Sequence, residues 1–227
     1  MSLGNPENPE FILYTYFRSS CSARLRIALE LKSIPYRSNY INLLQNEQSG
    51  PAYDAINPSH LVPSLQHVES RTTITQSIAI LEYLEEKYPD RCPLLPPPSN
   101  SMGRAHVRAL AGVIACDTQP VINLRILRRV NAFGGTKEQW AKELMAEGLA
   151  AFERMVAKTA GRFSYGDSVT MADVCLVPAI WGAERFGVDV KHYPIICKVI
   201  KEMEGLEEVQ KAHWRRQEDT PVDLRVE

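Results

Sequence analysis

The spacing of hydrophobic residues changes along the chain, and this change predicts two different kinds of structure. In the first ninety residues, runs rich in β-branched and aromatic residues predict four strands, at 11–17, 36–43, 62–68 and 72–75. Apolar positions at helical spacing predict helices at 22–31 and 77–89. The element order is therefore βαβ followed by ββα, which indicates a small α/β domain.

Beyond residue 102 the strand signal disappears. Helical periodicity predicts further helices, at 103–130 with a kink at Pro120, 138–161, 170–186 and 194–206. Between the two halves, the proline-rich segment CPLLPPPSNS predicts a stiff linker. We therefore expect a disordered leader (1–10), an α/β domain (11–91), a linker (92–101) and an all-helical domain (102–227).

Composition excludes several functional classes. The 227 residues carry a formal net charge of −1, which does not favour a nucleic-acid partner or a membrane surface. The apolar runs are too short to span a bilayer, and the N-terminus does not resemble a signal peptide. The five cysteines are widely spaced, without a C-x-x-C pair, and no histidine cluster has zinc-ligand spacing. We expect a reduced, cytoplasmic protein with no metal site.

The sequence SSCS at 19–22 lies where the first strand leads into the first helix. Its single cysteine, Cys21, has no neighbouring partner, so the motif cannot cycle between dithiol and disulfide. Hydroxyl and thiol groups at a helix N-terminus favour an anion such as a thiolate. The simpler interpretation is that Ser20 or Ser22 only caps the helix, and the residues alone leave both interpretations open.

Two more motifs in the same domain could bind a ligand. A cis Val62–Pro63 bond would turn the backbone of Val62 outward, where an extended peptide could pair with it. Gln76 and Ser77 begin a helix and could bind a carboxylate. Each has an ordinary alternative: Val-Pro is a common dipeptide, and Ser77 could be a plain cap.

Thr170 and Asp173 form a predicted capping box, with Val169 and Val174 at the positions of a hydrophobic staple. This arrangement stabilises the start of a buried helix. Its expected role is in folding and not in chemistry.

Taken together, SSCSARLRIAL, N-P-x-x-x-V-P-S-L, the Q-S helix start, T-M-A-D, GAERF (182–186) and QEDTPVDLR (217–225) resemble the zeta class of glutathione transferases. The resemblance runs from Phe11 to about Arg225. It implies a thioredoxin-like N-terminal domain followed by an all-helical domain, glutathione as cofactor, and a homodimer.

The resemblance also implies roles for individual residues. The glutathione sulfur is expected near Ser19, Ser20 and Cys21, with Ser19 the main donor and Cys21 assisting or acting as a nucleophile itself. The full set of expected glutathione-binding residues is Ser19, Ser20, Cys21, Ser22, Ala23, Arg24, Gln48, Val62, Gln76, Ser77, Gln119, Asn123, Leu124 and Arg125. Arg24 and Arg185 are expected to bind a dicarboxylate substrate, whereas Arg18 and Arg26 are expected to be solvated and to have no role.

The reaction that the resemblance implies is cis-to-trans isomerisation of maleylacetoacetate to fumarylacetoacetate, in phenylalanine and tyrosine breakdown. The thiolate adds to the double bond, the bond rotates, and elimination releases the product. Two alternatives stay open: a general glutathione transferase or α-haloacid dehalogenase, and a non-catalytic scaffold that only binds other proteins.

Overall fold

The computed structural model describes residues 7–226, and the chain divides into two compact units. The first unit contains the residues up to Pro93 together with the segment from Leu206 onward, and the second is Leu94–Gly205. The expected leader at 1–10 lies largely outside the described residues. Glu10, its last residue, is held in the first unit: its amide donates to the carbonyl of Pro35 (3.0 Å), and its carboxylate pairs with Lys87 (2.8 Å).

The sheet of the first unit confirms the predicted βαβ–ββα order. Within residues 7–226 its four strands lie in the order β2-β1-β3-β4, with β1 parallel to β2 and β3 antiparallel to both β1 and β4. The strands are β1 (Phe11–Thr15), β2 (Tyr36–Tyr40), β3 (Ser64–His67) and β4 (Thr73–Thr75). Each predicted strand is present, and β2 ends three residues earlier than the pattern suggested, shortly before the turn at residues 43–46.

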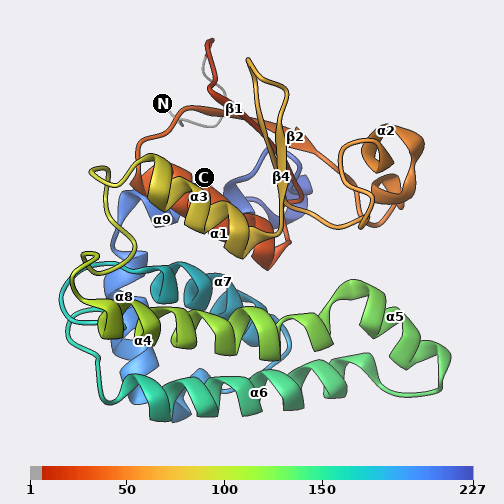
Figure 1. Cartoon of the computed structure of the whole chain (residues 1–227). Coiled ribbons are helices and arrows are strands. Elements are labelled where there is room, and N and C mark those ends of the chain that lie inside the picture. Colours follow the sequence, from red (N-terminus) through yellow and green to blue (C-terminus); the bar gives the residue numbers. More distant parts are fainter. Residues whose placement is uncertain (1–6, 227) are drawn as a thin grey trace. The chain divides into compact units, whose positions relative to one another are not determined.

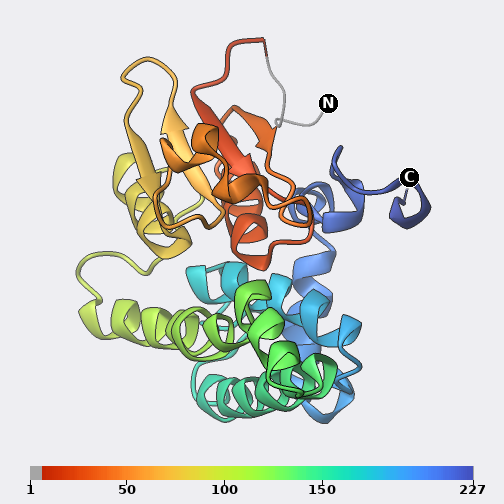
Figure 2. The same ribbon diagram turned by 90° about the vertical axis from the view of Figure 1, so that its right-hand side faces the viewer.

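Helices cover both faces of this sheet. The helices are α1 (Ser20–Leu31), α2 (Pro51–Asp54), α3 (Ser77–Lys87) and α9 (Glu207–Ala212). Figure 1 shows α1 and α3 on one side of the strands and α2 on the other, and Figure 2 shows the same sheet turned by a quarter. Apolar side chains fill both interfaces: Leu25 and Ile80 are fully buried, and Tyr14, Tyr53 and Val62 belong to a cluster of buried residues.

Arg26 is buried inside the first unit and does not lie in solvent, so the expectation that it is solvated is wrong. Its side chain is fully buried and donates four hydrogen bonds, to the Ala212 carbonyl (3.1 Å), Thr15 Oγ1 (3.0 Å), the Tyr16 carbonyl (3.4 Å) and the Phe17 carbonyl (3.0 Å). A planar guanidinium with five N–H donors suits such a set of diverging acceptors. Burial lowers the pKa of Arg26, and nearby Tyr36 and Asp219 oppose that shift.

The C-terminal segment is part of this arrangement. Asp219 accepts a hydrogen bond from the Phe17 amide (2.8 Å), and α9 packs against α1. The segment from Leu206 onward therefore groups with the α/β unit, which differs from the boundary expected from the sequence. From the sequence we predicted no helix at 207–212 and expected this segment inside the helical domain (102–227).

The second unit is helical, as predicted. Its helices are α4 (Ser101–Gly112), α5 (Leu124–Ala132), α6 (Lys137–Val156), α7 (Met171–Arg185) and α8 (Pro194–Glu204). Helix α7 is buried along its first ten residues and packs against α4, α6 and α8, so it forms the centre of the unit. The capping box is confirmed, because the Thr170 amide and hydroxyl both donate to Asp173 Oδ2, at 2.7 and 2.8 Å.

The predicted 103–130 helix is interrupted earlier than its proline suggests. After α4 comes a π-helical segment, Val113–Thr118, and then a short 3-10 turn, Pro120–Ile122. Thr118 Oγ1 donates to the carbonyl of Val113 (2.7 Å), which helps to fix the wider turn. A π-helical segment inside a helix often marks a functional region.

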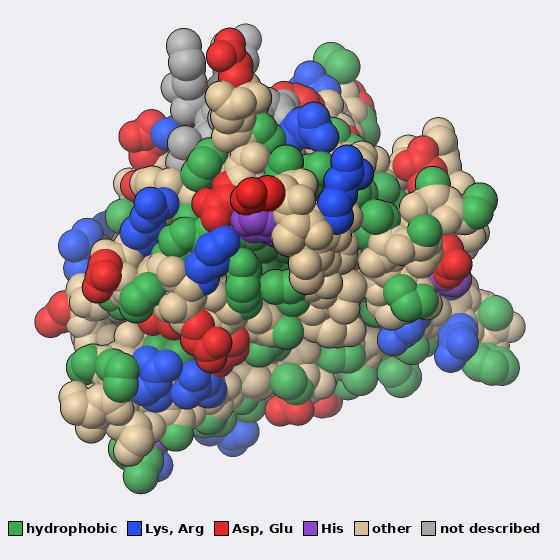
Figure 3. Space-filling view, turned by 45° about the horizontal axis from the view of Figure 1, so that its top comes forward, with side chains coloured by type: hydrophobic (Ala, Val, Ile, Leu, Met, Phe, Trp, Pro, Cys, Tyr) green, Lys and Arg blue, Asp and Glu red, His purple; other side chains and the backbone are tan. Residues whose placement is uncertain are grey.

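By length and composition alone, the stretch Ser101–Ala132 qualifies as one candidate membrane span. A single candidate is weak support for a membrane protein, because core helices of water-soluble proteins pass the same test. Here the stretch is interrupted by the π-helical and 3-10 segments, and Val107, Leu110 and Ile114 are buried in the unit. The face of the molecule in Figure 3 carries charges of both signs, interspersed with apolar side chains.

We expect Arg26→Met to lower the free energy of unfolding by about 3–5 kcal/mol, because it removes a buried charged donor and leaves its acceptors unpaired. Urea unfolding at fixed pH and salt measures this change. The matched control is Arg37→Met, at an exposed position of β2, which should change stability by about 0.5 kcal/mol or less. Equal effects of the two substitutions would contradict the role given to Arg26.

Candidate active site

The three motifs singled out in the sequence meet at one end of the sheet of the first unit. In the strand register, Tyr14 on β1 lies opposite Ser64 on β3, and Ser64 lies opposite Thr75 on β4. The residues that follow β1, precede β3 and follow β4 therefore lie at the same end of the strands. These are the SSCS motif, the Val62–Pro63 pair and the Gln76–Ser77 helix start.

Ser19 is the N-cap of α1. Its Oγ accepts a hydrogen bond from the Ser22 amide (3.1 Å), and its carbonyl accepts from the Ala23 amide (2.9 Å). A hydroxyl that accepts at its oxygen still has its own proton to donate. Ser19 can therefore cap the helix and donate to an anion at the same time, so the two interpretations of the motif are compatible.

The rest of the motif is divided between surface and interior. Ser20 and Cys21 are partly exposed on the first turn of α1, whereas Ser22 and Ala23 are buried. The Ser22 hydroxyl has no hydrogen-bond partner among the described residues, and its side chain faces the interior. Ser20 and Cys21 are thus better placed than Ser22 or Ala23 for a side-chain contact with a ligand.

The Val62–Pro63 peptide bond is cis, as proposed from the sequence. The segment before it is fixed from two sides, because the Tyr53 hydroxyl and Asn57 Nδ2 both donate to the Leu61 carbonyl at 2.7 Å. Within the described residues, the amide and carbonyl of Val62 have no hydrogen-bond partner in the protein. The backbone of Val62 can therefore pair with an extended peptide.

Gln76 and Ser77 form the start of α3. Gln76 is exposed, with φ 71° and ψ 115°, a conformation that is costly for a residue other than glycine. Ser77 is buried at the first helical position, and its Oγ accepts a hydrogen bond from Arg24 Nη1 (3.0 Å). Strained backbone of this kind is typical of ligand-binding positions.

The side chains of Arg24 and Gln48 are both hydrogen-bonded to neighbouring side chains. The Arg24 side chain is 1% exposed and directed at Ser77, so its burial disfavours the direct contact with substrate that we expected. Gln48 donates from Nε2 to Asn46 Oδ1 (2.8 Å), and its Oε1 has no partner among the described residues. Its amide group is held within its own turn.

The remaining predicted residues belong to the second unit. Gln119 and Asn123 flank the 3-10 turn Pro120–Ile122, and Leu124 and Arg125 are the first two residues of α5. Asn123 Oδ1 caps this helix by accepting from the Arg125 amide (3.1 Å). The indole of Trp140 donates to the carbonyl of Val121 (2.9 Å) and so ties this turn to α6.

Arg185 belongs to the same unit and lies in the last turn of α7. It is exposed, and its guanidinium lies 4.6 Å from the centre of the Phe186 ring.

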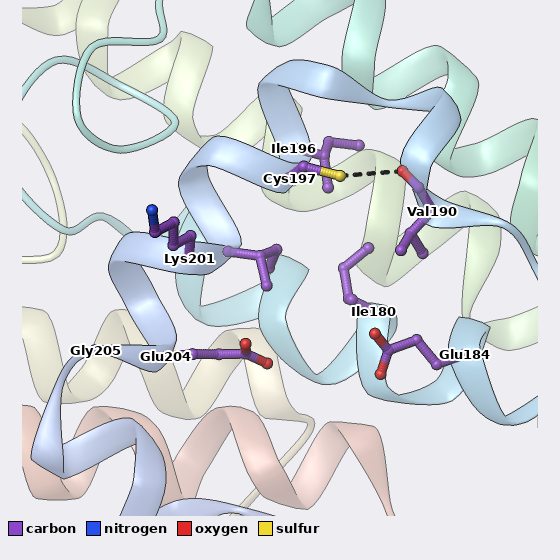
Figure 4. A pocket seen from close by; sticks show the side chains of 9 residues that line it. Ile180, Glu184, Val190, Ile196, Cys197, Lys201, Glu204 and Gly205 are labelled. Atoms are coloured by element: carbon purple, nitrogen blue, oxygen red, sulfur yellow. Dashed lines mark hydrogen bonds between the residues drawn. The ribbon is translucent and has the colours of Figure 1, made fainter.

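A separate pocket of about 370 Å³ lies between α7 and α8 in the second unit (Figure 4). Apolar side chains such as Ile180 and Ile196 line it, and the Cys197 thiol in its wall donates to the Val190 carbonyl (3.2 Å). Burial, followed by the charge of Glu204, raises the pKa of Glu184 at this pocket. None of the residues predicted for the site lines it, so the pocket is distinct from the candidate site.

Comparisons with known proteins agree with this geometry. The family model described as "Glutathione S-transferase, N-terminal domain" matches residues 18–87, and "Glutathione S-transferase, C-terminal domain" matches 131–213. A maleylacetoacetate isomerase of Aspergillus fumigatus is 56% identical and covers 96% of each chain. That of Mus musculus is 44% identical over the whole of both chains.

Solved structures give the same result. A maleylacetoacetate isomerase from Anaeromyxobacter dehalogenans, with glutathione bound in its active site, has a TM-score of 0.84 and 43% identity over 93% of this chain and 98% of its own. A bacterial maleylpyruvate isomerase, described as a zeta-class glutathione transferase, has a TM-score of 0.88 and 38% identity over 92% of this chain and 100% of its own.

The chain therefore belongs to the glutathione S-transferase family. Within that family it belongs to the zeta class, which confirms the resemblance inferred from the motifs. Among the described residues, no group of three His, Cys, Asp or Glu side chains is gathered as a metal site would need.

Sequence reasoning missed the residues that hold the site in place. Tyr53 and Asn57 fix the turn before Val62, and Arg26 fixes the turn before Ser19. For Asn57 a signal was available, since an Asn-Pro dipeptide commonly initiates a turn.

The backbone of Gln76 provides a test of strain at the site. We expect Gln76→Gly to be more stable than Gln76→Ala by about 1 kcal/mol in urea unfolding without ligand, because only glycine adopts a positive φ without cost. Gln66 on β3 is the control, because its φ is not positive: there the alanine variant should be more stable than the glycine variant. Equal stability of the two Gln76 variants would show that the position is not strained.

Proposed function

We propose that this protein is a glutathione-dependent isomerase that converts maleylacetoacetate to fumarylacetoacetate. The main support is Ser19: it caps α1, still has a hydroxyl proton to donate, and lies at the edge of the sheet where Val62 and Ser77 also emerge. The names of the relatives at 44–56% identity support the reaction, and the neighbour with bound glutathione supports the cofactor.

The described residues fit glutathione. The tripeptide is extended, with a thiol in the middle and a carboxylate at each end, so it needs a backbone to pair with and places for anions. The open backbone of Val62 provides the first, and the N-termini of α1 and α3 provide the second. We assign the sulfur to Ser19 and Cys21, the γ-glutamyl end to Gln76 and Ser77, and the glycyl end to Gln48.

When bound, glutathione supplies a thiolate that adds reversibly to the substrate's double bond and so permits rotation. The task of the protein is to keep the thiol ionised. A free thiol titrates near pH 8.5, and lowering its pKa by about two units takes about 2.7 kcal/mol of selective anion stabilisation. The Ser19 hydroxyl and the N-terminus of α1 supply donors and dipole for this purpose.

The substrate is a dianion, so it needs cationic partners. We propose that Arg185 in the second unit binds one of its carboxylates, because an arginine fork matches a carboxylate in shape and charge. By the family resemblance, we assign Gln119, Asn123, Leu124 and Arg125 to the binding of glutathione.

Two further properties are part of this proposal. By family resemblance, we expect a homodimer located in the cytoplasm. Maleylpyruvate is a second candidate substrate, because structural neighbours at 38% and 31% identity are described as maleylpyruvate isomerases.

The decisive experiment follows maleylacetone isomerisation by ultraviolet absorbance, with and without glutathione. We expect no turnover without glutathione, and a loss of about 100-fold in kcat for Ser19→Ala, the size expected for losing one donor to a developing anion. The pH–rate profile of that variant should move to higher pH, because its bound thiol ionises less readily. Ser20→Ala is the matched control, with a smaller effect. Turnover that is equally fast without glutathione would disprove the proposal.

For Arg185→Ala we expect the KM for maleylacetone to rise about tenfold or more, while the KM for glutathione stays within about twofold. Steady-state kinetics with each substrate varied in turn measures both values. Arg185→Lys should not restore the KM fully, because a lysine lacks the planar fork. Equal changes in the two KM values would argue against a substrate role.

A further inference from the structure

Arg24 is an unusual residue to find inside the first unit. It is 1% exposed, yet only one of its three nitrogens has a partner, since Nη1 donates to Ser77 Oγ at 3.0 Å. Its Nε and Nη2 are buried and have no hydrogen-bond partner among the described residues. Burying an arginine that is not fully paired is unfavourable, so packing alone does not account for this side chain.

The Arg24–Ser77 hydrogen bond has a geometric consequence. A serine hydroxyl has one proton and two lone pairs. Because one lone pair accepts from the guanidinium, the proton of Ser77 must point away from Arg24. The bond also polarises the hydroxyl, which makes it a stronger donor to a further acceptor.

The location strengthens this effect. Ser77 is the first residue of α3, an eleven-residue helix whose N-terminus carries partial positive charge. Arg24 places a full charge 3.0 Å from the Ser77 hydroxyl oxygen. A buried charge is poorly screened by solvent, so it polarises this hydroxyl more strongly than a surface arginine would.

We propose that Arg24 is a positioning residue for the α-carboxylate of the γ-glutamyl group, acting through the Ser77 hydroxyl. This inference rests on the proposed function, since it takes glutathione as the ligand. It assigns Arg24 to the carboxylate at one end of the cofactor and not to the substrate.

The test compares two ligands by isothermal titration calorimetry: glutathione and γ-aminobutyryl-cysteinylglycine, which is the same molecule without the α-carboxylate. We expect Arg24→Met to weaken glutathione binding about tenfold and to change the binding of the analogue less than twofold. We expect the same two results for Ser77→Ala: weaker binding of glutathione and little change in the binding of the analogue. Because Arg24 acts through Ser77, the double variant should bind glutathione no more weakly than Ser77→Ala alone.

The matched control is Arg18→Met, which removes the same charge from the same segment. Arg18 lies over the Phe17 ring, 5.3 Å from its centre, and the variant should keep the wild-type preference for glutathione over the analogue. If Arg24→Met does not fold, Arg24→Lys replaces it, and its preference should fall between those of the wild type and Ser77→Ala.

Three results would overturn the inference. The first is that Arg24→Met weakens the binding of both ligands equally, and the second is that the effects of the two substitutions on glutathione binding add in the double variant. The third is that Arg24→Lys keeps the wild-type preference for glutathione over the analogue. If the wild type binds glutathione and the variants give one of these results, only the role of Arg24 is refuted. A wild type that does not bind glutathione refutes the proposed function.

Discussion

The position of Ser19 depends on one buried guanidinium. Arg26 donates to Thr15, Tyr16 and Phe17, the residues that lead from β1 toward the helix that Ser19 caps, and also to the carbonyl of Ala212 in α9. The turn therefore has one defined conformation, because its carbonyls are bound to a donor that is itself fixed in the interior. The C-terminal segment closes over the same group, so the end of the chain takes part in fixing its first functional residue.

The two buried arginines of α1, Arg24 and Arg26, differ in how completely the protein satisfies their hydrogen-bond donors. They are two residues apart, and on a helix such positions do not share a face. Arg26 is satisfied by four acceptors within the protein and serves the fold, whereas Arg24 has one acceptor and two unpartnered nitrogens. This contrast supports the proposal that α1 holds one structural cation and one cation that orients a ligand-binding hydroxyl.

Periodicity and turn chemistry predicted the four strands, most of the helices and their order, as well as the Thr170–Asp173 capping box. They left the conformation of the Val62–Pro63 bond open, and that bond is cis. They did not predict the burial of Arg24 and Arg26, because a charged residue in a helical pattern looks the same whether its partners are water or distant backbone. The partner of Arg26 in α9 is 186 residues away. The sequence pattern likewise predicted no helix at α9 and placed residues 207–212 in the helical domain, whereas α9 packs against α1. Long-range pairing is decided by tertiary packing, which a single sequence does not encode locally.

A binding site built in this way gains little from the overall charge of the protein, which is formally −1. In the proposed site the donors are a capping hydroxyl and two helix N-termini, and a buried guanidinium donates to the serine that begins one of these helices. Such groups are already oriented, so they attract an anion without reorganisation, and salt screens them weakly. Arg185 is exposed and subject to screening. High salt should therefore weaken the binding of a dianionic substrate more than that of glutathione, which separates the two kinds of recognition by their physical origin.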